Sequence, residues 1–60
     1  MEKQKFYLVA ADALPEVFLR VAEAKRMLQV GEAATVGDAA RQVGISRSAF
    51  YKYKDAVQPF

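Results

Sequence analysis

Basic and hydroxyl-bearing residues near the carboxyl end of the chain have the types and spacing to contact DNA. Between residues 41 and 54 the charged residues are all cations, namely Arg41, Arg47, Lys52 and Lys54. On a helix that begins near residue 47, the first two turns can present side chains to base edges in the major groove. We therefore predict base contacts by Arg47, Ser48, Tyr51 and Lys52.

Part of the same basic stretch is predicted to contact the DNA backbone. Ammonium and guanidinium groups bind phosphate oxygens and supply the salt-dependent part of the affinity. The predicted phosphate contacts are Arg41, Lys52 and Lys54. Double-stranded DNA is the partner expected on this interpretation, although such a group of cations is also typical of a solvated helix face.

A helix, a short turn and a second helix over residues 35–58 would position these side chains. Thr35 and Ser46 are of the residue types that cap helices, and each precedes a helical pattern. Gly44 falls in the turn, where a left-handed backbone reverses the chain with least strain. The second helix is expected to run to about Val57, because the proline two residues later cannot continue it. The pattern is typical of a DNA-binding helix-turn-helix.

A longer helix over residues 12–31 is predicted to act as the scaffold. Asp12 can cap it, Pro15 suits its first turn, and Gly31 is a stop signal. Apolar residues recur at the three- and four-residue spacing of one helix face. They are Leu14, Val17, Phe18, Val21, Ala24 and Leu28.

The first residues, 1–11, are predicted to form a strand or arm. Phe6 to Val9 is a short aromatic and branched run that suits a β-strand. A lone strand leaves its backbone groups unpaired, so we expect Lys5 to Val9 to pair with the same strand of a second copy; a frayed or irregular arm is the alternative. The expected homodimer interface combines this strand with apolar residues outside the stripe of the long helix. Its predicted members are Phe6, Leu8, Leu19, Met27 and Val30.

Composition restricts the classes of protein to which the chain can belong. Its 60 residues form one domain at most, and their 53% apolar content is typical of a folded chain. Without cysteine or histidine, the chain has no disulfide framework and no clustered metal ligands, so we expect no metal and no cofactor. No apolar run approaches the ~20 residues of a membrane span, which predicts a cytoplasmic protein without membrane contact. The predicted fold class is mainly α, with three helices and a short amino-terminal strand.

Several segments resemble the amino-terminal region of a family of bacterial ACT-domain proteins. They are FYLV at 6–9, LPE at 14–16, EAK at 23–25, VGISRSAFYKYK at 43–54 and the final PF. Members of that family are described from their sequences as regulators, or as chorismate-mutase-related proteins of phenylalanine synthesis. The resemblance implies that an ACT domain, a βαββαβ module that often binds amino acids, should follow Phe60. We expect no small molecule to bind the 60 residues themselves.

Three functions follow from these features. The first is the sequence-specific DNA-binding domain of a transcriptional regulator, which would act as a homodimer with its last helix in the major groove. The second is a protein-interaction or oligomerisation module with a helix-turn-helix shape and no role in DNA binding. The third is a helical mutase that surrounds a dicarboxylate with cations; we do not expect this enzyme, because the cations are predicted on an exposed face.

Overall fold

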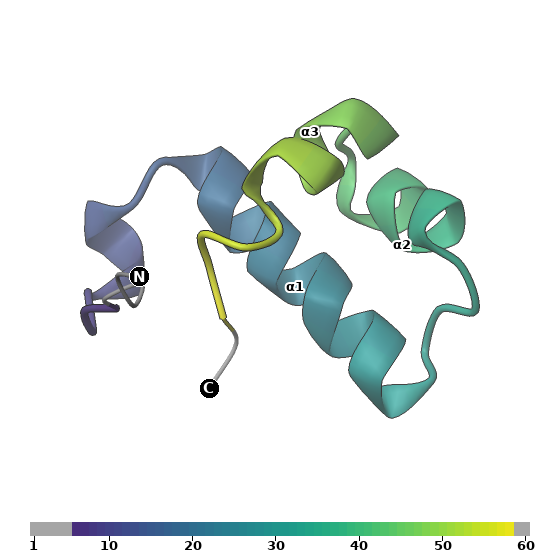
Figure 1. Cartoon of the computed structure of the whole chain (residues 1–60), viewed down its shortest axis with the longest axis horizontal. Coiled ribbons are helices and arrows are strands. Elements are labelled where there is room, and N and C mark those ends of the chain that lie inside the picture. Colours follow the sequence, from purple (N-terminus) through teal and green to yellow (C-terminus); the bar gives the residue numbers. More distant parts are fainter. Residues whose placement is uncertain (1–5, 59–60) are drawn as a thin grey trace, which may run out of the picture.

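The computed structural model describes residues 6–58, which form a short 3-10 helix and three α-helices. The 3-10 helix η1 spans Ala11–Ala13, and the long helix α1 spans Glu16–Val30. Two short helices follow, α2 at Val36–Val43 and α3 at Arg47–Tyr53. Figure 1 shows α2 and α3 together on one side of α1, with the amino-terminal arm beyond the start of α1. The prediction of a mainly α domain is confirmed.

The core lies where α1 meets the two short helices. Val21 and Ala24 of α1 and Ala39 of α2 have no exposed surface, and Phe50 of α3 is only 4% exposed. Alanine at these crossing points lets the helix backbones approach closely, so that one large ring can fill the space between them. The sulfur-bearing side chain of Met27 completes this cluster from α1.

The starts of α2 and α3 and the end of α2 are determined by the residues that the sequence indicates. Thr35 Oγ1 accepts a hydrogen bond from Asp38 N–H at 3.0 Å, and Ser46 Oγ accepts one from Ala49 N–H at 3.1 Å. Each bond satisfies a backbone donor that the first turn of a helix leaves unpaired. Gly44 ends α2 in the left-handed conformation, with φ +83°. Both predicted caps and the predicted turn glycine are confirmed.

The predicted amino-terminal strand is not found in the described part of the chain. Residues 6–10 are irregular, as the alternative prediction had it, no strand occurs anywhere within 6–58, and the strand pairing across a dimer finds no support. The predicted strand also included Lys5, which lies outside the described residues. A lone strand has unpaired backbone groups, and within residues 6–58 no other strand is present to pair with them; Leu8 is left 84% exposed.

Two helix boundaries also differ from the sequence-based expectation. Asp12 lies within η1 and does not cap α1; Pro15 occupies the cap position, with an extended ψ of 147° and no side-chain cap bond. At the other end of the chain, α3 stops at Tyr53 rather than near Val57. There, Ala56 N–H donates to Tyr53 O at 2.9 Å, a bond of the tighter turn that often closes a helix.

Candidate functional site

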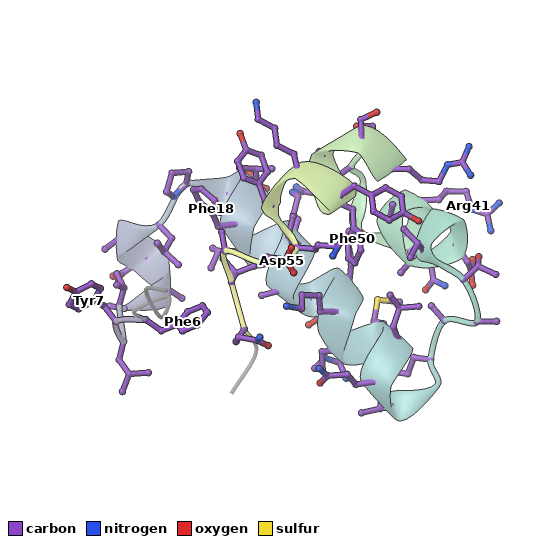
Figure 2. All side chains as sticks on the ribbon, viewed as in Figure 1. Phe6, Tyr7, Phe18, Arg41, Phe50 and Asp55 are labelled. Carbon is purple, nitrogen blue, oxygen red and sulfur yellow. The ribbon has the colours of Figure 1, made fainter. Side chains whose placement is uncertain are left out.

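An apolar groove lies between the arm, the first half of α1 and the segment that follows α3. Its volume is about 560 Å³. The arm contributes Phe6 and Leu8, α1 contributes Phe18, Leu19 and Ala22, and the carboxyl segment contributes Ala56, Val57 and Gln58. Figure 2 shows Phe6 projecting from the arm into the space on the side of α1 where Phe18 lies. The groove therefore brings together segments from the two ends of the described chain.

The side chains that line the groove are uncharged and mostly apolar. Among the described residues that line it, none carries a charge, and only Tyr7 and Gln58 have polar side-chain groups. Phe6 is 51% exposed and Tyr7 is 80% exposed, so the arm side of the groove is open to water. Such a surface can bury an apolar group from a ligand, but it offers no ionic partner to a charge placed within it.

Contacts within the fold hold the walls of the groove. The rings of Phe18 and Tyr53 meet edge to face, with centroids 5.0 Å apart and planes at 72°. Lys25 Nζ donates to two backbone carbonyls beyond α3, Lys54 O at 2.5 Å and Val57 O at 2.7 Å. These contacts fasten the segment after α3 to α1. The sequence pattern did not predict that Lys25 holds this segment. A single lysine on a helix does not indicate hydrogen bonds to residues about 30 positions away.

Two of the three predicted phosphate contacts, Arg41 and Lys54, lie within ion-pair distance of acidic neighbours. Arg41 Nη2 donates to Asp38 Oδ1 at 2.8 Å, and this bond holds the pKa of Asp38 below its ordinary value, with help from Gln42. Lys54 Nζ lies 3.3 Å from Asp55 Oδ1. The acidic residues that flank the basic stretch in sequence therefore partly neutralise it in space.

The residues predicted to contact bases are all exposed on α3, namely Arg47, Ser48, Tyr51 and Lys52. Lys52 Nζ lies 5.4 Å from the ring centroid of Tyr53. The aliphatic stem of Arg47 lies against Gly37, with its Cδ 3.4 Å from where a Cβ would stand. Tyr51 is 56% exposed, and its ring meets that of Phe50 edge to face. Ser48 is exposed as well. Sequence reasoning placed Tyr51 correctly on the outer face but did not predict its contact with the core ring.

The residues predicted for a dimer interface do not share one surface. Phe6, Leu8 and Leu19 line the groove. Val30, which is 59% exposed, is the last residue of α1, at the opposite end of that helix. Met27 is only 6% exposed and belongs to the core, so its predicted place at an interface is wrong. Met27 lies about one turn after Ala24 on the buried face, which is broader than the apolar stripe indicated.

Residues 6–58 show neither a metal site nor a membrane span. No cluster of three histidine, cysteine, aspartate or glutamate side chains there is arranged to hold a metal ion. No helix in this part of the chain is long and apolar enough to cross a membrane.

Fold and groove define a small helical domain with an apolar groove on its surface, and comparison with known proteins identifies its relatives. The chain is 59% identical over 56 residues to a UPF0735 ACT domain-containing protein of Acetivibrio thermocellus, which covers 93% of the chain and 38% of that protein. It is 57% identical over 60 residues to the protein of the same name in Carboxydothermus hydrogenoformans, covering all of the chain and 41% of the relative. In Halalkalibacterium halodurans a relative of that name is 50% identical over the same length.

The chain spans about two fifths of the length of the curated relatives it matches. No family model matches it, and no solved structure does. The predicted relationship to ACT domain-containing proteins is nevertheless supported, because relatives from several bacteria share this name at high identity. The names of these relatives make no reference to phenylalanine synthesis or chorismate mutase.

The comparisons correct the functional prediction. The relatives are named for an ACT domain and not as DNA-binding or helix-turn-helix transcription regulators, so the predicted function and its DNA partner are wrong. The expectation that no small molecule would bind is contradicted as well, since the name refers to a class of module that often binds amino acids. The error arose from a short turn signature and a run of cations, both of which also occur in ordinary helical domains.

Proposed function

We propose that the chain is the helical part of a small-molecule-responsive regulatory protein of ACT type, and that its apolar groove takes the apolar body of a small ligand. The observation that carries this proposal is the groove itself, a hollow of about 560 Å³ lined by uncharged side chains from both ends of the described chain. Binding sites for small molecules commonly have volumes of about 300–1,000 Å³ and are lined by apolar and aromatic groups.

The lining restricts the class of ligand. Phe6 and Phe18 offer ring edges and faces to an aromatic or branched group, and such ring pairs add to the free energy gained from buried area alone. A charge inside the groove would lose its water without gaining an ionic partner, so charged ends of the ligand should remain at the open side. An amino acid with a large apolar side chain has this form, because its charged groups lie at one end.

Ligand binding at this groove can be tested by an NMR titration of the 60-residue chain labelled with ¹⁵N. Phenylalanine is the probe, and glutamate, which has the same charged end but no apolar body, is the control ligand. We expect phenylalanine to shift the amide signals of Phe18, Leu19, Ala22 and Val57, which surround the groove. Glutamate should leave the same signals in place.

Two variants test whether phenylalanine binds in the groove itself. Ala22→Leu places a larger side chain in the groove, whereas Gln29→Leu adds a leucine to an exposed position of the same helix outside it. Filling the groove should weaken phenylalanine binding by roughly tenfold, the equivalent of about 1.4 kcal/mol, and the control variant should bind normally. Absence of any phenylalanine-specific shift in the unmodified chain would refute the proposed ligand site.

A further inference from the structure

We infer that Lys25 is a positioning residue that holds one wall of the groove in place. The effect of Lys25 on ligand binding, but not its effect on the wall, rests on the proposed function. Lys25 does not line the groove; it acts from the opposite side of the segment that does. Its ammonium donates to Lys54 O at 2.5 Å and to Val57 O at 2.7 Å. These two acceptors lie on either side of Asp55 and Ala56 and thus bracket the turn after α3.

The position of the two carbonyls explains why a cation is suited to this place. The last carbonyls of a helix have no partner within the helix and carry partial negative charge. Helix α3 ends at Tyr53, so Lys54 O is among these unpaired groups. A lysine has three donors on a long stem, which lets one side chain on α1 reach two carbonyls of another segment.

The consequence for the groove follows from chain connectivity. Val57 accepts the bond through its carbonyl, and the residues on either side, Ala56 and Gln58, line the groove together with Val57 itself. Fixing the Val57 carbonyl therefore fixes the backbone of this wall. The bond from Ala56 N–H to Tyr53 O is local to the turn and does not connect the wall to α1.

Other contacts would keep the fold intact when Lys25 is replaced. The Val57 side chain packs against the core, and Tyr53 retains its contact with Phe18. Lys25 is only partly buried, and none of its bonds within the described chain is to a core side chain. Loss of the ammonium should loosen residues 54–58 and leave the helices in place.

The test compares Lys25→Met with Lys54→Met in the 60-residue chain. Both variants lose one positive charge, but Lys54 contributes its backbone carbonyl to the contact, and its own ammonium pairs with Asp55. In Lys25→Met we expect the carbonyl ¹³C signals of Lys54 and Val57 to move and the Ala56 amide to exchange roughly tenfold faster. Lys54→Met should leave the Ala56 exchange rate unchanged, and Lys25→Arg, which keeps a cationic donor, should restore most of the protection.

Two readouts separate this inference from the proposed ligand site. If the Ala56 amide and both carbonyl signals are unchanged in Lys25→Met, the positioning role is overturned. Equal acceleration of the core amides Val21 and Ala24 would also overturn it, because the effect would then be general destabilisation. If phenylalanine fails to bind the unmodified chain while the Ala56 amide still exchanges faster in Lys25→Met, the proposed function fails and the positioning role stands.

Discussion

Two glycines with nearly the same backbone conformation allow the contribution of one arginine contact to be measured. Gly31 follows α1 with φ +84°, and Gly44 follows α2 with φ +83°. A Cβ added at Gly31 would meet nothing within 4 Å, whereas one at Gly44 would stand 2.8 Å from Arg20 Nη1. That guanidinium donates to Val43 O at the end of α2. Alanine at the two sites therefore imposes the same backbone strain but different contacts.

The expected free energies follow from these contacts. A left-handed backbone costs an L-residue about 1–2 kcal/mol, and the loss of unfolded-state freedom on replacing glycine returns about 0.4–1 kcal/mol. Gly31→Ala should therefore destabilise the domain by about 0–1.6 kcal/mol. Gly44→Ala should cost about 1 kcal/mol more, because it displaces Arg20 from its carbonyl and a net hydrogen bond contributes about that amount. For a chain of this size, 1 kcal/mol lowers Tm by about 4–8 °C.

Thermal unfolding followed by circular dichroism measures both costs, and Arg20→Met supplies the control. In the Arg20→Met background the clash and the bond are both absent, so Gly44→Ala and Gly31→Ala should lower Tm by equal amounts. The reasoning fails if the two alanine variants are already equal in the presence of Arg20. It fails equally if the difference between them persists after Arg20 is replaced.

Two further changes test the core and the charge pairs. Phe50→Ala removes the nearly buried ring between the helices and should lower the free energy of unfolding by about 3–5 kcal/mol. That loss is comparable to the ~3–9 kcal/mol total expected for a 60-residue domain. The variant should therefore lack a cooperative unfolding transition at 25 °C in a urea titration. Arg41 holds the pKa of Asp38 low, so the pair stabilises the fold above the ordinary aspartate pKa of about 3.9 and loses this effect as the pH falls through the lower folded value. Asp38→Asn should accordingly lower Tm slightly at pH 7, and its Tm should converge with that of the parent chain at pH 2.5; a constant difference over this range would contradict the pairing.

Local signals in the sequence predicted the helix boundaries well where one residue determines the backbone. Thr35, Ser46 and Gly44 each act through a bond or a dihedral angle within a few positions of themselves. Such interactions are fully specified by neighbouring residues, so the sequence shows them directly. The same is true of the buried face of α1, of which Val21 and Ala24 were expected members.

Interactions between distant segments were not predictable in this way. The groove requires Phe6 and Val57 to approach the same part of α1, although they lie 51 positions apart in sequence. Lys25 likewise meets carbonyls whose place depends on where α3 ends. The run of cations misled for a different, local reason: acidic residues just outside the run pair with its two ends, Asp38 with Arg41 and Asp55 with Lys54.

Helix α1 explains why the groove and the core are separate surfaces of one small domain. Val21, Ala24 and Met27 face the short helices and are buried, whereas Leu19 and Ala22 face the groove and are only partly covered. Phe18 connects the two surfaces, because it lines the groove and also contacts Tyr53 of α3. A ligand that orders the groove would therefore act on the Phe18–Tyr53 contact, and through it on the end of α3 that Lys25 holds. The groove and the end of α3 are thus connected directly, through the Phe18–Tyr53 contact and through the segment 56–58 that follows the helix.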